Sequence, residues 1–184
     1  MNKKDFLKKT KIVNVVVSGT FDKEIDLEKI ARYIPKSIYE PSMFSGLVLR
    51  KLNPKSTLIM FKSGKITSVG TKSEKEGKNN LKESAFDLGN VLKTKIHATK
   101  IKTVNVFAVS DIDQNIDLKK IVKKIVLTNY NPKRFAAAII LLNKKQVMVY
   151  GSGKIMCMGR KNENEAKDIL FTTYKLLKTK QIID

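Results

Sequence analysis

The sequence predicts an α+β fold made of two tandem copies of one unit, because blocks of residues recur in order and each copy alternates strand and helix periodicities. Three pairs of blocks share an offset of 91 residues: 13–15 with 104–106, 25–27 with 116–118, and 39–44 with 130–135. Two further pairs share an offset of 89: 63–65 with 152–154, and 70–72 with 159–161. The offset changes where the second copy has a shorter predicted hairpin turn. A structural duplication tolerates insertions and deletions in such turns.

Each copy contains the same series of predicted elements: a strand, a short helix, further strands in antiparallel hairpins and a long helix. In the first copy the strand candidates are residues 11–18, 46–52, 57–62 and 65–70. Asp26 is a predicted cap for a short helix that Pro35 closes. The pattern Ser73-x-x-Glu76 predicts a capping box for a long helix to about Lys93, and Asn162-x-x-Glu165 opens its counterpart. We therefore divide the chain into a basic segment 1–11, a first repeat 12–99 and a second repeat 100–184.

Composition restricts the function. The chain has 184 residues and a formal net charge of +20, which favours a polyanionic partner such as nucleic acid. A Lys-rich surface that reflects an A/T-rich genome is the alternative. A single cysteine and a single histidine argue against a disulfide framework, a multi-cysteine zinc site and a Ser-His-Asp triad. We find no apolar run long enough for a membrane span and no secretory signal.

Strand alternation predicts one sheet face packed on helices and one uncovered face. The two copies are expected to pair into one long antiparallel sheet. The residues expected on the uncovered face are mostly apolar: Asn14, Val16, Thr57, Ile59, Phe61, Lys65, Thr67 and Val69, then Asn105, Phe107, Gln146, Met148, Tyr150, Lys154, Met156 and Met158. Such a face indicates a binding site, although a second buried layer, such as a partner sheet, explains the pattern equally well.

An apolar face with lysines at its edges suits a widened minor groove better than the major groove. Major-groove readout needs Arg or Gln side chains that reach base edges. In the minor groove a central Asn can donate to the acceptors of A·T pairs, and aromatic side chains can wedge between base steps.

These residues resemble the TATA-binding protein family of eukaryotes and archaea, from about Ile12 to Leu177. The stretches that carry the resemblance are IVNVVVSGT at 12–20, YEPSMFSGLVLRKLNPKSTLIMFKSGK at 39–65, YNPKRFAAAII at 130–140 and YGSGKIMCMGRK at 150–161. The resemblance implies a saddle in which one long curved antiparallel sheet carries helices on its convex face. It also implies a general transcription factor that binds A/T-rich promoter DNA in the minor groove, kinks it and nucleates the preinitiation complex.

The resemblance implies two aromatic pairs, one for each end of the DNA element. Phe44 and Phe61 match the first pair, whereas the second is Phe135 with Tyr150 in place of phenylalanine. Two further departures are Val69 and Met158, where the family has groove-lining threonines. The residues expected to contact DNA, from the face and the resemblance together, are Asn14, Val16, Phe44, Arg50, Ile59, Phe61, Lys65, Thr67, Val69, Lys72, Asn105, Phe107, Arg134, Phe135, Met148, Tyr150, Lys154, Met156, Met158 and Lys161.

The basic residues in this set are expected phosphate contacts, but they are unequal in the two copies. Met43 stands where the second copy has Arg134, and Leu141 stands where the first copy has Arg50. The implied partners are double-stranded DNA, a transcription factor IIB-like factor and RNA polymerase. The protein is expected to be a monomer on DNA, with a dimer possible when it is free, in the nucleus, or in the cytoplasm of an archaeal or viral system.

Other functions fit the residues less well. The departures leave open a divergent family member that acts mainly as a protein-interaction platform with weak DNA preference. An enzyme is disfavoured, because no acidic cluster or base lies on the predicted face, and no cofactor or metal is expected. Met156-Cys157-Met158 lacks a second thiol or His for a soft-metal site, and Ser63-Gly64-Lys65 lacks the spacing of a phosphate loop. His97 is expected in an exposed linker.

Overall fold

The computed structural model describes all residues, 1–184, and contains five helices and ten strands. The strands are β1 (Thr10–Phe21), β2 (Ser37–Ile38), β3 (Gly46–Leu52), β4 (Lys55–Phe61), β5 (Lys65–Thr71), β6 (Ala98–Asp111), β7 (Thr128–Asn129), β8 (Ala137–Leu142), β9 (Lys145–Tyr150) and β10 (Lys154–Arg160). The helices are α1 (Lys3–Lys8), α2 (Leu27–Tyr33), α3 (Glu74–Leu92), α4 (Leu118–Lys124) and α5 (Glu163–Thr179).

The chain forms two compact units. The first-repeat unit is residues 14–105, and the second-repeat unit combines residues 1–13 with 106–184. The division falls within β1 and β6. The strand order is β2-β3-β4-β5-β1 in the first unit and β6-β10-β9-β8-β7 in the second, antiparallel in each. The α+β class and the tandem repetition are thus confirmed, whereas the boundaries 12–99 and 100–184 stay a prediction.

Local sequence signals account for the helices. The side chains of Asp26, Ser73 and Asn162 each accept a hydrogen bond from the backbone N–H three residues on, so the three predicted caps are confirmed. Helix α3 ends at Lys93, which takes the left-handed conformation. The sequence did not locate the short strands β2 and β7, because two residues are too few for an alternation pattern to show.

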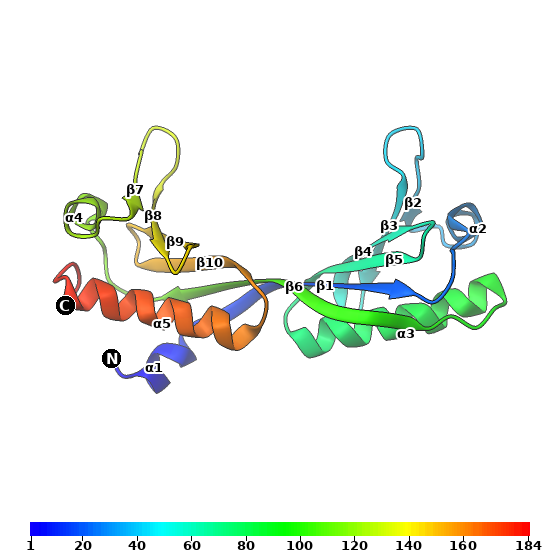
Figure 1. The fold of residues 1–184 in the computed structure, drawn as a ribbon, viewed down its shortest axis with the longest axis horizontal. Coiled ribbons are helices and arrows are strands. Elements are labelled where there is room, and N and C mark those ends of the chain that lie inside the picture. The colour runs from blue at the N-terminus through cyan, green and yellow to red at the C-terminus, as the bar shows by residue number, and fades with distance from the viewer. The chain divides into compact units, whose positions relative to one another are not determined.

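In each unit the long helix lies along one side of the sheet (Figure 1). In the first unit Leu81, Ala85 and Leu88 of α3 are buried together with Val15 and Val17 of β1. Gly77 lies so close to the sheet that a Cβ atom there would sit 2.5 Å from Val17 Cγ2. In the second unit Ala166, Leu170, Thr173 and Leu177 of α5 are buried as expected, whereas Ile169 is only half-buried.

The two cores differ in their polar content. In the first unit Asn80 of α3 donates to the hydroxyls of Ser56 and Ser68, at 2.9 and 2.8 Å. The positions that match Asn80 and Ser68 in the second unit are Ile169 and Cys157, so no such bridge joins helix and sheet there. The polar anchor of the second unit is instead at the end of β10.

The basic segment expected at 1–11 forms helix α1, which packs on α5 within the second-repeat unit (Figure 1). Phe6 is fully buried, with its ring 5.5 Å from that of Phe171 and 5.2 Å from that of Tyr174. Lys3 pairs with Asp168 at 2.8 Å. The sequence did not predict this contact, because a six-residue amphipathic segment is too short to identify its partner.

Replacement of the anchoring aromatic tests this packing. We expect Phe6→Ala to lower the free energy of unfolding of the second-repeat unit by about 3 kcal/mol, because it leaves a cavity between α1 and α5. Urea denaturation of the full chain measures the effect. Phe86→Ala is the control, since Phe86 is 71% exposed and its loss should cost within about 0.5 kcal/mol. Equal losses in the two variants would show that α1 is not docked.

Candidate nucleic-acid interface

The open face of each sheet, which we define as the face opposite α3 or α5, is partly exposed and mostly apolar. Along β4 the exposure alternates: Ser56, Leu58 and Met60 are buried, whereas Thr57 and Ile59 are half-exposed. The same alternation runs along β1, β5, β9 and β10. No segment of its own unit covers either open face, whereas the alternative of a partner sheet from another subunit stays a prediction.

Strand register places the predicted residues in rows across the open face. In the first unit Val16 pairs with Val69, and Val69 pairs with Thr57. In the second unit Met156 of β10 pairs with Met148 of β9, and Met148 pairs with Ile139 of β8. Side chains distant in the sequence thereby form a continuous apolar surface within each unit.

Four half-exposed residues of the open face were not among the residues expected to contact DNA. Ser18 and Val48 lie in the row of Thr67 and Ile59. Val109 and Ile139 lie in the row of Met156 and Met148. Their parity along each strand was visible in the sequence, but pairing partners were needed to place them beside the predicted residues.

Asn14 is held in one orientation by a backbone irregularity. The register of β1 against β5 shifts between Val15 and Val16, and Gly70 opposite takes a φ of +106°, which favours glycine. Gly70 N donates to Asn14 Oδ1 at 2.8 Å. Since the amide oxygen is engaged, the amide NH₂ is the group of Asn14 that can donate to a ligand on the open face.

The second unit repeats this irregularity at the matching position. The register of β10 against β6 shifts between Cys157 and Arg160, and Gly159 takes a φ of +78°. Asn105 is half-exposed beside it, and Met158 is 48% exposed. Bulges of this kind redirect side chains next to functional sites.

An aromatic pair stands at one end of the open face in each unit. The rings of Phe44 and Phe61 are 5.7 Å apart and edge-to-face at 71°, and those of Phe135 and Tyr150 are 6.1 Å apart at 65°. Phe44 and Phe135 are 44% and 42% exposed. These two rings are therefore not ordinary core aromatics.

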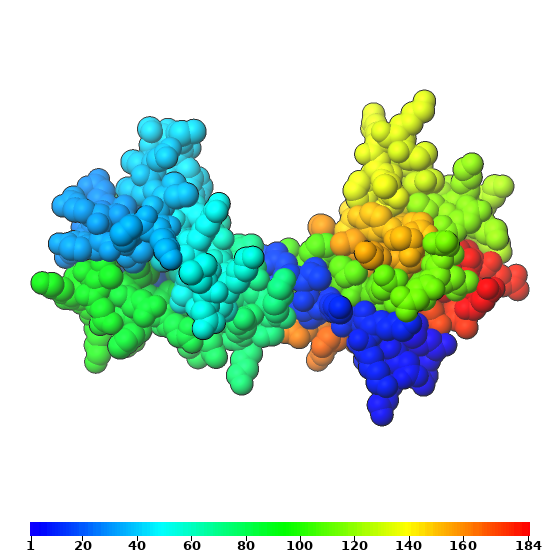
Figure 2. Space-filling view, turned by 180° about the vertical axis from the view of Figure 1, so that it is seen from behind, coloured from blue at the N-terminus to red at the C-terminus, as the bar shows by residue number.

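The two exposed rings are carried by matching turns. The backbone N–H groups of Phe44 and Phe135 each donate at 2.9 Å to the carbonyl four residues before, on Glu40 and Asn131. The connections that contain these turns, β2–β3 in pale blue and β7–β8 in yellow, stand out as narrow projections of their units (Figure 2). Gly46 leaves room for the ring, because a Cβ atom there would lie 2.7 Å from Phe44 Cε1.

The basic residues predicted to contact phosphates are placed at or near the surface of their units: Arg50, Lys65, Lys72, Arg134, Lys154 and Lys161 are all exposed. Arg50 pairs in register with Thr57, at the edge of the open face. The positions at which the two copies differ in charge also lie at the surface. Met43 and Leu141, the counterparts of Arg134 and Arg50, are 83% and 38% exposed.

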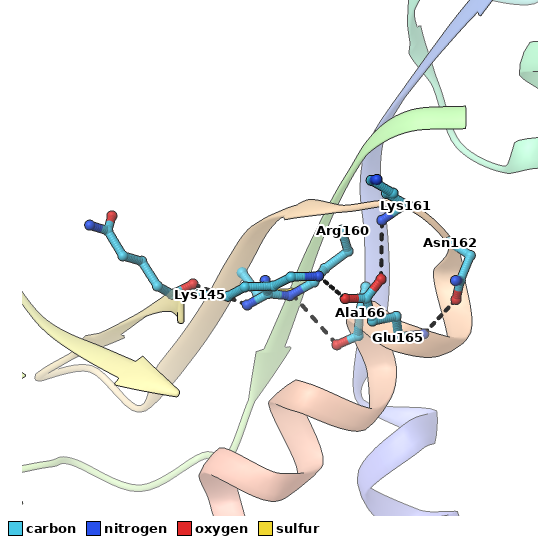
Figure 3. A network of polar contacts seen from close by, with 8 residues as sticks. Lys145, Arg160, Lys161, Asn162, Glu165 and Ala166 are labelled. Carbon is cyan, nitrogen blue, oxygen red and sulfur yellow. Dashed lines mark hydrogen bonds and ion pairs between the residues drawn. The ribbon is translucent and has the colours of Figure 1, made fainter. Parts of the chain in front are cut away.

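A polar network fixes the end of β10 in the second unit (Figure 3). The carboxylate of Glu165 accepts hydrogen bonds from the ammonium of Lys145 and, at 3.3 Å, from the backbone N–H of Lys161. The bond from Lys145 lowers the pKa of the Glu165 carboxyl. Arg160 is buried, and its guanidinium donates to the carbonyl of Gln146 at 3.4 Å. The network ties β9 and the start of α5 to the strand that carries Met156 and Met158.

Cys157 lies on the helix-covered side of β10, which opposes any role in a soft-metal site on the open face. Its thiol is buried and 3.6 Å from the carbonyl oxygen of Ala166. Burial raises the pKa of this thiol to about 11. The structure contains no group of three or more His, Cys, Asp or Glu side chains able to hold a metal, and no helix with the length and hydropathy of a membrane span.

Comparison with known proteins gives the family. The family model described as "Transcription factor TFIID (or TATA-binding protein, TBP)" matches twice, at residues 9–90 and 100–180. The chain belongs to the TATA-binding protein family. It is 36% identical to the TATA-box-binding protein of Methanocaldococcus jannaschii over 87% of this chain and 88% of the relative, and 34% identical to that of Archaeoglobus fulgidus over 86% and 89%.

A solved structure supports the assignment. Methanococcus jannaschii TBP superposes with a TM-score of 0.79 at 33% identity, covering 95% of this chain and 99% of that chain. The TATA-binding protein family is a family of general transcription factors and not of enzymes, so the chain has a general transcription factor role. The resemblance noted from the sequence is thereby confirmed.

The pH dependence of stability tests the Glu165 network. A lowered carboxyl pKa stabilises the fold above the ordinary value of 4.5, and this contribution is lost as the pH falls through the lower folded value. We expect Glu165→Gln to reduce stability near neutral pH and to flatten its decline below about pH 4.5. Thermal melts against pH measure this, with the exposed Glu24→Gln as control. A decline as steep as in the wild type would contradict the role of Glu165.

The reactivity of Cys157 tests its burial. With a pKa near 11 and no access to solvent, the thiol should not react with a disulfide reagent in the folded chain. Labelling should become rapid only in denaturant. Fast labelling of the native protein would show that α5 does not cover β10.

Proposed function

We propose that the open face of each unit binds the minor groove of A/T-rich promoter DNA, and that each aromatic pair enters a base step and kinks the duplex. The observation that carries this proposal is the half-exposed apolar surface with a ring more than two-fifths exposed at one end, in both units. Covering an exposed apolar surface lowers the free energy, so a surface of this kind favours binding to a partner.

Kinking of the duplex allows an apolar protein face to pack against DNA. Unstacking a base step costs a few kcal/mol, and the opened minor groove then covers more apolar protein surface. Phe44 and Phe135 can enter a step without disturbing their own units, because a large part of each ring is already outside the core. Pyrimidine–purine steps such as TA unstack most easily, which favours A/T-rich sites.

Asn14 supports the preference for A·T pairs. Its amide NH₂ remains a donor after Gly70 has engaged the oxygen, and the minor-groove edge of an A·T pair presents only acceptors. Asn105 occupies the matching place in the second unit and is proposed to act in the same way. The residues of the open faces around them are proposed to make apolar contacts.

The exposed basic residues are proposed to bind phosphates at the edges of the groove. Six such contacts would give a slope of about −5 for the logarithm of affinity against the logarithm of salt concentration. The missing basic side chains at Met43 and Leu141 make the two ends unequal, so one orientation on an asymmetric promoter is favoured.

We further propose that the chain acts as a monomer on DNA, together with a transcription factor IIB-like factor and RNA polymerase. Its localisation, in the nucleus or in the cytoplasm, stays a prediction.

A DNA-bending assay tests the proposed function. A duplex with a central A/T-rich element, labelled at both ends for energy transfer, should shorten when the chain binds. Phe44→Ala should lower affinity roughly tenfold or more, equal to about 1.4 kcal/mol or more, and reduce the bend. Tyr33→Ala is the control, because Tyr33 is 65% exposed but lies on α2. Salt-sensitive binding without a preference for A/T-rich sequence and without a bend would refute the proposal.

The amide of Asn14 has its own test. Asn14→Asp keeps the acceptor for Gly70 N but removes the NH₂ donor and adds a negative charge on the open face. We expect affinity for the A/T-rich duplex to fall by about tenfold or more, while the folded structure is retained. A melting temperature equal to that of the wild type with unchanged DNA affinity would show that the amide does not contact the bases.

A divergent role as a protein-interaction platform with weak DNA preference is the second candidate. It is favoured by three departures from the residues that the family resemblance implies. Val69 and Met158 replace groove-lining threonines and lack their hydroxyls, and Tyr150 replaces a phenylalanine and adds a hydroxyl. Val69→Thr and Met158→Thr distinguish the candidates. A large gain in A/T selectivity would support the second, whereas full selectivity in the wild-type chain would support the first.

A further inference from the structure

A groove in the first-repeat unit has no role in the interface described above. It lies between the C-terminal half of α3 and the segment 93–98, has a volume of about 700 Å³ and is lined by residues of both. The helix α3 packs on the side of the sheet opposite the open face, so the groove is separate from the proposed DNA surface. Figure 1 shows the green segment that leaves α3 and turns back toward β6.

The apolar part of the groove is an aromatic ring that the fold leaves in solvent. Phe86 lies on the outer side of α3 and is 71% exposed, whereas Ala85 and Leu88 beside it face the core. Gly89, Ala98 and the buried Ile96 also line the groove. A partner that covers Phe86 would remove its apolar surface from water and so stabilise the complex. The chain alone does not bury this ring.

The rim of the groove is positively charged. Lys82, Lys93 and Lys95 line it and are exposed. Of two nearby carboxylates, Asp22 accepts from the backbone N–H of His97, a residue that lines the groove, and Asp87 lies 3.8 Å from Lys51 Nζ, away from it. The groove therefore combines a single large apolar anchor with basic groups that complement carboxylates.

The walls of the groove are held in place by specific contacts. Lys93 caps α3 in the left-handed conformation, and Thr94 N donates to the carbonyl of Gly89 at 3.0 Å. Lys23 Nζ donates to the hydroxyl of Thr94 at 3.1 Å. A ligand would thus find the site already formed, which reduces the entropy lost on binding.

The second-repeat unit shows how the same helix is covered when a partner segment is present. There the short helix α1 inserts Phe6 against Phe171 and Tyr174 of α5. The positions of α3 that match these two aromatics are Lys82 and Ala85, so α3 lacks that dock and carries Phe86 instead.

Charge identifies the occupant of the groove on α3. The chain's own short helix α1 carries lysines at 3, 4 and 8, so a second copy of it would be repelled by the basic rim. We propose that this groove binds an acidic amphipathic segment of a partner protein, with a large apolar side chain of the partner packed on Phe86 and its carboxylates facing Lys82, Lys93 and Lys95. The interaction does not depend on DNA binding.

Selection from random peptides tests this proposal. Short peptides displayed on phage are selected on the immobilised full chain. We expect the enriched peptides to be net acidic and to contain large apolar residues three or four positions apart. Their affinity, measured by fluorescence anisotropy, should fall about tenfold or more for Phe86→Ala and for Lys82→Glu.

Two control variants distinguish this groove from other exposed aromatics. Tyr33→Ala removes an exposed ring elsewhere in the same unit, and Phe44→Ala removes one from the open face. Both should leave peptide affinity within about twofold of the wild type. The proposal is overturned if no peptides are enriched, if the enriched peptides are neutral or basic, if Phe86→Ala binds them as tightly as the wild type, or if Phe44→Ala weakens them.

Discussion

The packing of one long helix against one face of each sheet is the constraint on which the rest of the structure depends. Buried side chains such as Leu81 and Leu88 of α3 and Leu170 and Leu177 of α5 hold the helices to the strands. Because the long helix of each unit is used on that side, the alternate residues of the strands remain uncovered. The core that stabilises each unit therefore also creates its apolar open face.

The two repeats reach this arrangement with different polar chemistry. Asn80 links α3 to Ser56 and Ser68 in the first unit, whereas the second unit replaces this link by Glu165 with Lys145 and by the buried Arg160. Features that serve the open face are kept in both: the exposed ring on its turn, the glycine with positive φ, and the asparagine beside it. Between the two copies, these features of the open face are therefore kept, although the polar links between helix and sheet differ.

The outer sides of the long helices also differ between the two repeats. The helix α5 uses Phe171 and Tyr174 to bind the chain's own N-terminal helix, and α3 presents Phe86 within a basic groove. A duplicated fold can thus offer two different surfaces away from the shared interface. In this chain the second of the two units covers its long helix with a segment of its own.

The sequence by itself determined the duplication, the helix caps and the strand parity, because these features follow from local spacing and recur at fixed offsets. The family followed from the resemblance of its motifs to those of known proteins. Strand parity made Asn14 a site candidate, and the resemblance to the family made Phe44 and Phe135 site candidates. Only the tertiary structure decided that Gly70 fixes the Asn14 amide, that Ser18 and Val109 pair in register with Thr67 and Met156, and that Phe6 docks on α5. These features depend on register and on contacts between residues far apart in the chain, which no local pattern encodes.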